Sequence, residues 1–151
     1  MIGRAREREA LSAALAAGSG VVVLEGEPGI GKSRLLAWAA EAAGAEVLSA
    51  RASEYEADLP YALWTEALDG ELPEGDRHGV HRALRSWLEE RAPVVVCLDD
   101  VHWADPASVD ALAALVHRPP AGDVLLVLTT RTGQLPSGLG AVAPLRVGPL
   151  N

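Results

Sequence analysis

The chain has 151 residues, 49% of them hydrophobic, so it is long and apolar enough to form one domain with a sizeable core. Thirteen Lys and Arg against 21 Asp and Glu give a formal net charge of −8, which argues against a surface that grips DNA or an anionic membrane. The single cysteine, Cys97, excludes a disulfide framework and a multi-cysteine zinc site within the chain. No apolar run approaches the roughly 18 residues that span a bilayer. We therefore expect a cytoplasmic domain with no membrane contact and no direct nucleic-acid contact.

Hydrophobic patterning predicts alternating helices and strands along the chain. Segments with leucines at helical spacing indicate helices, and short β-branched runs bounded by Gly or Pro indicate buried strands. In chain order we predict a helix over 4–17, a strand over 21–25, a helix over 32–43, a strand over 46–50, a loop over 51–59, a helix over 59–68, a loop over 69–79, a helix over 80–91, a strand over 94–98, a helix over 106–117, a strand over 124–130 and a strand over 142–147. This order predicts an α/β fold class, with three α/β/α layers around a mainly parallel five-stranded sheet.

The most specific motif is the run GEPGIGKS at 26–33, which fits the pattern G-x-x-x-x-G-K-[ST]. A predicted strand precedes it and a predicted helix follows it, so backbone N–H groups and the helix N-terminus can surround a phosphate. Lys32, the only lysine of the chain, can reach the β and γ phosphates, and the Ser33 hydroxyl can ligate Mg²⁺. The predicted nucleotide-binding residues are Gly26, Glu27, Pro28, Gly29, Ile30, Gly31, Lys32, Ser33 and Arg34.

Two carboxylates, Asp99 and Asp100, end the most apolar predicted strand. A carboxylate at the tip of a strand beside a phosphate loop can hold Mg²⁺, and a second one can polarise the attacking water. Strands also end in Asp for turn chemistry alone, but the preceding phosphate loop favours the functional interpretation. We assign Asp99 to magnesium and Asp100 to water activation.

A third polar strand end is Thr129-Thr130-Arg131, on the strand predicted over 124–130. It is positioned to sense the γ-phosphate, with Arg131 offsetting its charge, and the alternative is a solvated strand end. The predicted catalytic residues are therefore Lys32, Asp100 and Arg131.

These residues together resemble the P-loop ATPases of the AAA-like and STAND group. The closest resemblance is to the ATPase domains of large ATP-binding LuxR-type transcriptional regulators. It is carried by Gly3-Arg4 with Glu7 and Leu11, by GEPGIGKSRLL at 26–36, by Leu59-Pro60-Tyr61, by LDDVHWADPA at 98–107 and by LTTR at 128–131.

The resemblance implies a P-loop NTPase core over 1–151 that binds ATP or ADP with Mg²⁺ and switches an output domain, often one that binds DNA. It also implies that Gly3-Arg4 lies near the adenine. Members of the group continue into a helical lid or winged-helix region, so we expect this segment to be a truncated core, with exposed apolar surface and nucleotide-dependent self-association. The chain has no arginine between Arg131 and Arg146, so hydrolysis assisted in trans by an arginine finger is not expected.

Other signals have structural interpretations. We expect His102 and Trp103 to pack the loop, Asp105 to cap the following helix, and His78, His81 and His117 to be solvated. Cys97 and the four tryptophans are more typical of a core than of a reactive or base-stacking site.

Two function classes remain: a slowly hydrolysing ATP switch, and a structural module that holds ADP or ATP without hydrolysis. A small-molecule kinase is disfavoured, because only Arg131 and Arg146 follow Arg118 and could serve as lid arginines.

Overall fold

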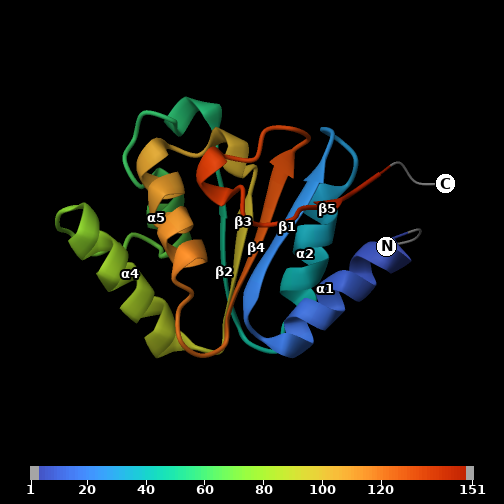
Figure 1. Ribbon diagram of the computed structural model, residues 1–151, viewed down its shortest axis with the longest axis horizontal. Coiled ribbons are helices and arrows are strands. Elements are labelled where there is room, and N and C mark those ends of the chain that lie inside the picture. Colours follow the sequence, from blue (N-terminus) through green and yellow to red (C-terminus); the bar gives the residue numbers. More distant parts are fainter. Residues whose placement is uncertain (1–3, 149–151) are drawn as a thin grey trace.

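One parallel β-sheet organises the chain in the computed structural model, which describes residues 4–148. Its strand order is β2-β3-β4-β1-β5, and all four strand pairs are parallel (Figure 1). The strands are β1 (Gly20–Gly26), β2 (Glu46–Arg51), β3 (Val94–Asp99), β4 (Val124–Arg131) and β5 (Leu145–Arg146). The predicted fold class, an α/β core with a five-stranded parallel sheet, is confirmed.

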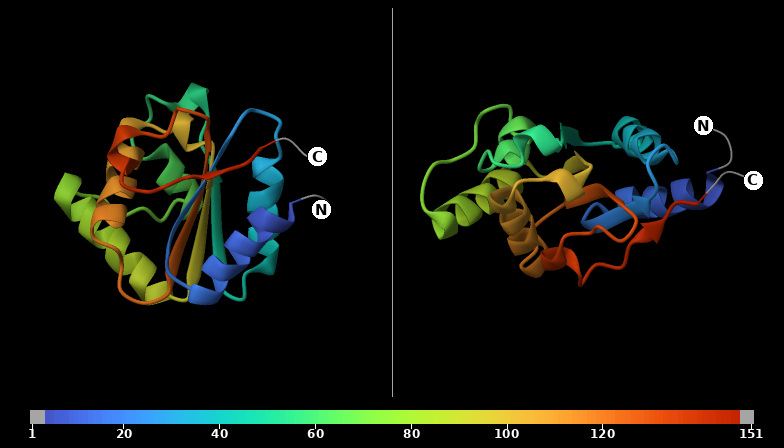
Figure 2. Two further views of the ribbon diagram at one scale, coloured as in Figure 1. Left: turned by 45° about the vertical axis from the view of Figure 1, so that its right-hand side comes forward. Right: turned by 90° about the horizontal axis from the view of Figure 1, so that it is seen from above.

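Helices cover both faces of this sheet (Figures 1 and 2). On one face lie α1 (Ala5–Ala17) and α2 (Lys32–Ala42), and on the other lie α3 (Ala62–Ala67), α4 (Arg77–Arg91) and α5 (Pro106–His117). Short 3-10 turns follow β2, β3 and β4; they are η1 (Glu54–Glu56), η2 (Val101–Trp103) and η3 (Ser137–Leu139). No helix within residues 4–148 is long and apolar enough to cross a membrane.

The core is split by the sheet into two apolar clusters, as strand alternation requires. On β3, Val94, Val96 and Leu98 face the cluster beneath α3, α4 and α5, whereas Val95 and Cys97 face α1 and α2. All of β3 is buried, which explains its unbroken apolar sequence. Burial raises the pKa of the Cys97 thiol to about 11, so it is a packing residue, as predicted.

Three elements have boundaries that differ from the prediction by more than one residue. The helix predicted over 59–68 begins only at Ala62, because Tyr61 adopts φ 61°, outside the helical region. The helix predicted from 80 begins at Arg77, where the Asp76 carboxylate caps it by accepting from the Gly79 N–H at 2.7 Å. The last strand is two residues long instead of spanning 142–147, and Pro144 directly before it has no N–H to donate.

One prediction about a single side chain is wrong. His81 is 8% exposed rather than solvated, and its Nε2 lies 3.4 Å from Asp110 Oδ2 between α4 and α5. Trp103 packs on the His102 ring, with 5.2 Å between the ring centroids, and is 38% exposed. Helical spacing puts His81 beside Val80 and Leu84 on the buried side of α4, a position that its polar neighbours in sequence obscure.

Asp105 caps α5 as predicted and also fixes the unusual backbone before α3. Its Oδ2 accepts from the Ser108 N–H at 2.9 Å and from the Tyr61 N–H at 2.7 Å. Replacing it with alanine removes both acceptors, so we expect Asp105→Ala to lower the free energy of unfolding by about 2 kcal/mol. Urea denaturation of the two proteins measures this. The same curves for Asp76→Ala, which loses one cap bond, should show a smaller loss, and an equal loss would contradict the double role of Asp105.

Candidate functional site

The carboxyl ends of β1, β3 and β4 bring the predicted site residues to one edge of the sheet. Gly26, the last residue of β1, is paired in register with Arg131 of β4, and Asp99 ends β3 on the far side of β4. Ligands of open parallel sheets bind at this edge, so the topology places the phosphate loop beside both the acidic and the arginine-bearing strand ends.

The loop between β1 and α2 has the backbone that a phosphate cradle needs. Gly29 and Gly31 adopt φ 79° and 106°, which side-chain-bearing residues rarely adopt. A Cβ on Gly26 would stand 2.9 Å from the Val147 carbonyl oxygen and from Ile30 Cγ2, so the strand end must be glycine. α2 begins at Lys32, and its first N–H groups therefore have no intrahelical acceptor and are available to an anion.

Lys32 is 7% exposed and folds back over this loop. Its Nζ donates to the carbonyl oxygens of Gly26, at 2.5 Å, and Glu27, at 2.9 Å. Burial lowers the pKa of Lys32, and the carboxylates of Asp100 and Asp99 partly oppose this effect. The ammonium is thus held at the mouth of the phosphate cradle. Arg34, the last predicted loop residue, is exposed on the first turn of α2.

Asp99 joins the acidic strand end to the loop. Its Oδ2 accepts from the Ser33 hydroxyl at 2.8 Å, and its Oδ1 accepts from the Thr129 hydroxyl. Burial alone would raise the pKa of Asp99, but hydrogen bonds from Thr129, Arg51 and Ser33 outweigh it, and the pKa lies below its usual range. Asp99 is therefore a buried, ionised carboxylate in contact with the predicted magnesium-ligating hydroxyl.

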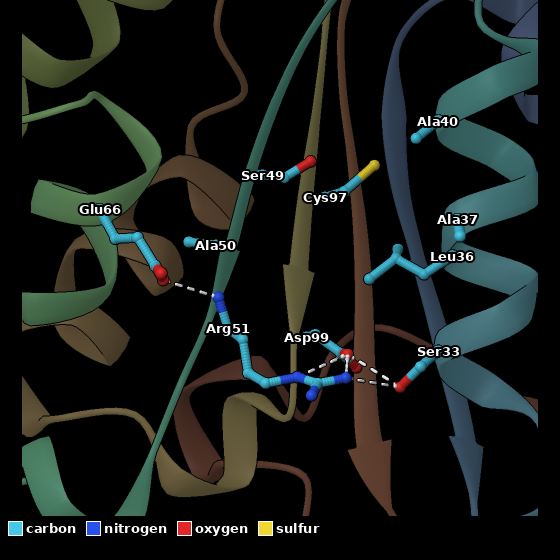
Figure 3. A pocket seen from close by; sticks show the side chains of 10 residues that line it. All are labelled: Ser33, Leu36, Ala37, Ala40, Ser49, Ala50, Arg51, Glu66, Cys97 and Asp99. Carbon is cyan, nitrogen blue, oxygen red and sulfur yellow. Dashed lines mark hydrogen bonds and ion pairs between the residues drawn. The ribbon is translucent and has the colours of Figure 1, made fainter.

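Arg51 is the site residue that the sequence analysis missed. It ends β2 in register with Asp99, and its Nη2 lies 2.7 Å from Asp99 Oδ2 and 3.1 Å from Ser33 Oγ (Figure 3). An open cavity of about 350 Å³ adjoins these three side chains, between α2 and the strands β2 and β3. The predicted strand stopped at residue 50, which assigned the arginine to a loop. If the predicted strand over 46–50 is extended by one residue and aligned with the strand that ends at Asp99, Arg51 is placed beside Asp99.

Asp100 and Arg131 stand at the same edge as Asp99. Asp100 has φ 56°, its N–H donates to Thr129 Oγ1 at 2.8 Å, and its carboxylate is about one-third exposed. The Arg131 N–H donates to His102 Nδ1 at 3.2 Å, which ties the end of β4 to η2. Burial lowers the pKa of His102, consistent with a neutral ring that accepts this bond. The Thr129 hydroxyl bonds to the Asp99 carboxylate and to the Asp100 N–H. The positive charge at this strand end comes from Arg131.

Arg4 lies against the phosphate loop. It is 5% exposed and donates to the carbonyl oxygens of Ile30 and Gly148, so it joins the N-terminal helix, the loop and the segment after β5. Gly3, which the resemblance also places near the adenine, lies outside the described residues.

The donor set fits magnesium rather than a metal held by protein ligands alone. Among residues 4–148, no three His, Cys, Asp or Glu side chains are grouped so that they could hold an ion. A hydroxyl and a carboxylate in contact, Ser33 and Asp99, are hard oxygen ligands next to the phosphate cradle. Magnesium is typically bound by one or two such groups together with phosphate oxygens and water.

Comparison with known proteins agrees with this geometry. The sequence profile of the AAA ATPase domain family matches residues 1–77 and 70–128. The chain belongs to the AAA ATPase domain family. It is thus an AAA-type P-loop ATPase domain, an assignment that implies nucleotide binding.

Solved structures of other proteins share the fold at low sequence identity. RuvB of Thermotoga maritima, a Holliday junction branch migration motor, is 22% identical with a TM-score of 0.58, over 97% of this chain and 45% of that chain. PCH-2 of C. elegans is 18% identical with a TM-score of 0.59, over 96% of this chain and 43% of that chain. This AAA domain therefore spans less than half of either protein.

A curated relative is much longer. An uncharacterized protein of Rhizobium meliloti (strain 1021) is 40% identical over 80 residues, which is 51% of this chain and 8% of that protein. The chain thus matches less than a tenth of the length of this relative.

Proposed function

We propose that the domain binds ATP or ADP with Mg²⁺ at the loop 26–34 and hydrolyses ATP slowly, as a nucleotide-controlled switch. The observation that carries the proposal is the 2.8 Å hydrogen bond from Ser33 Oγ to Asp99 Oδ2. It joins the phosphate loop to the acidic strand end, the two parts that phosphoryl transfer to water requires in one place.

Each side chain then has a role that its position supports. The backbone of 26–34 cradles the phosphates, and Lys32, already held at the loop mouth, turns its ammonium to the β and γ phosphates. Ser33 and Asp99 would hold the magnesium ion, which offsets phosphate charge when bound. Asp100, the more exposed of the two acids, orients and deprotonates the attacking water. Arg131, beside Gly26 in the register, offsets charge on the γ-phosphate.

The biological setting is also a proposal. The sequence resemblance to LuxR-type regulators and the STAND group supports a cytoplasmic signalling or transcriptional regulator in which this domain contacts no DNA and other domains provide the output. The net charge of −8 is consistent with that division. Nucleotide-dependent self-association is the remaining expectation for the domain.

The second candidate function is a module that holds nucleotide without hydrolysing it. The observation in its favour is that Arg51 contacts both Asp99 and Ser33, and that its Nε lies 3.8 Å from Asp100 Oδ2. A cation that pairs with the acidic residues in this way opposes their use in catalysis.

Isothermal titration calorimetry with ATP and with ADP, each with and without Mg²⁺, tests the proposal. We expect saturable binding of both nucleotides that is tighter with the metal, because Ser33 and Asp99 contribute only through it. Phosphate release under single-turnover conditions then separates the two candidates. Folded protein that binds neither nucleotide at millimolar concentration would contradict both of them.

A further inference from the structure

The Arg51 guanidinium contacts both groups that would hold the metal. Its Nη2 and Nε lie 2.7 Å and 3.1 Å from Asp99 Oδ2, and Nη2 also lies 3.1 Å from Ser33 Oγ (Figure 3). The same Oδ2 atom accepts from the Ser33 hydroxyl at 2.8 Å. One carboxylate oxygen therefore receives three hydrogen bonds, and its lone pairs are engaged by the fork of the arginine.

A guanidinium in this place competes with a second cation. Two positive charges within about 4 Å repel each other, and the oxygen that a divalent ion would ligate is already taken. We propose that Arg51 is a built-in competitor of the magnesium ion, whose guanidinium must leave Asp99 and Ser33 before the metal can be held there. This inference rests on the proposed nucleotide and metal site.

The side chain of Arg51 can leave while its backbone stays. The main chain is fixed by pairing with Asp99 in the sheet and by the N–H bond to Glu66 Oε2 at 2.8 Å. The side chain, in contrast, is 61% exposed, whereas that of Asp99 is 8% exposed. The exposed guanidinium can return to water when it leaves the carboxylate, so a metal–nucleotide complex can displace it.

Displacement of the Arg51 guanidinium would change the surface at the edge of the sheet, next to α3. Arg51 ends β2, and its N–H is bonded to Glu66 on α3, so the residue connects the metal position to an element outside the phosphate loop. Nucleotide without metal leaves the guanidinium on Asp99, whereas nucleotide with metal releases it into solvent. The position of one side chain thus distinguishes the two loaded states.

Manganese provides a direct probe, because its binding is measured by electron paramagnetic resonance without any turnover. The protein is saturated with ADP and titrated with Mn²⁺. We expect Arg51→Ala to lower the dissociation constant for Mn²⁺ about fivefold, which corresponds to about 1 kcal/mol, because the competing cation is removed from Asp99. Arg51→Gln, which removes the charge and keeps most of the stem, should give a similar shift and serves if the alanine variant does not fold.

Arg77→Ala is the matched control. The Arg77 side chain is also 61% exposed and also donates through Nε and Nη2, in this case at 2.5 Å and 2.8 Å to the two carboxylate oxygens of Asp110. This pair joins α4 to α5 on the face of the sheet opposite α2. Its removal should leave the dissociation constant for Mn²⁺ unchanged.

The outcomes separate this inference from the proposed function. Wild-type protein that binds no ADP, with Mn²⁺ or with a chelator, refutes the proposed function and the inference with it. Wild-type protein that binds ADP, with Mn²⁺ affinity unchanged or weaker in Arg51→Ala and Arg51→Gln, overturns the inference alone. A tighter Mn²⁺ complex in both variants but not in Arg77→Ala supports it.

Discussion

Replacement of Lys32 with alanine is expected to weaken ATP binding by about 3 kcal/mol, more than a hundredfold, because charge-assisted hydrogen bonds to the β and γ phosphates are lost. The ammonium is buried at the loop mouth and bonded only to the carbonyl oxygens of Gly26 and Glu27 among the contacts that the structure shows. Carbonyl acceptors are neutral, so a phosphate oxygen competes well for this donor. Calorimetry with ATP on the two proteins measures the loss.

The sole lysine of the chain allows an independent check without a mutation. Amine-reactive reagents can modify only Lys32 and the N-terminal amine, and peptide mapping separates the two. Its pKa, lowered by burial, leaves more neutral amine at a given pH, but the same burial limits access. We expect saturating ATP to protect Lys32 and to leave labelling of the N-terminus unchanged. Equal ATP affinity in Lys32→Ala, or no protection, would show that the loop is only a turn.

Patterns within single segments were sufficient to predict the fold. The unbroken apolar run of β3 and the strand–loop–helix order around 26–33 are local features, and each fixes the type of its element. One contact of the candidate site follows in the same way: the hydrogen bond between Ser33 and Asp99 brings together two motifs that the sequence separates. The carboxyl ends of parallel strands meet at one edge, so this meeting follows from the fold class alone.

What the sequence could not show depends on register and on side-chain direction. Arg51 reaches Asp99 only because β2 and β3 pair in the register that sets these two residues side by side. The Thr129 hydroxyl, predicted at a phosphate-sensing strand tip, instead bonds to the Asp99 carboxylate and to the Asp100 N–H. Both contacts join different strands, and no periodicity within one strand encodes them.

Replacement of Asp100 with asparagine is expected to slow ATP hydrolysis at least about a hundredfold and to leave ATP affinity nearly unchanged. A group that accepts a proton in the transition state contributes to the rate and little to ground-state binding. Asparagine suits the position, because Asp100 has φ 56° and Asn, like Asp, tolerates this left-handed conformation. The backbone N–H bond to Thr129 is kept, so a loss of rate reports the carboxylate alone. Single-turnover phosphate release and calorimetry with ATP supply the two numbers.

Asp99→Asn is the comparison that assigns the roles of the two acids. Asp99 is the buried carboxylate that contacts Ser33, and its amide variant should lose the gain in ATP affinity that Mg²⁺ provides. Asp100 lies one residue further along the chain, with a more exposed carboxylate whose Oδ2 is 3.8 Å from Arg51 Nε. If the two variants lose ATP affinity to the same extent, both carboxylates serve the metal and the water has another base. If Asp100→Asn releases phosphate at the wild-type rate, then either hydrolysis does not need the Asp100 carboxylate or neither protein hydrolyses ATP. The rate of phosphate release by the wild-type protein decides between the two.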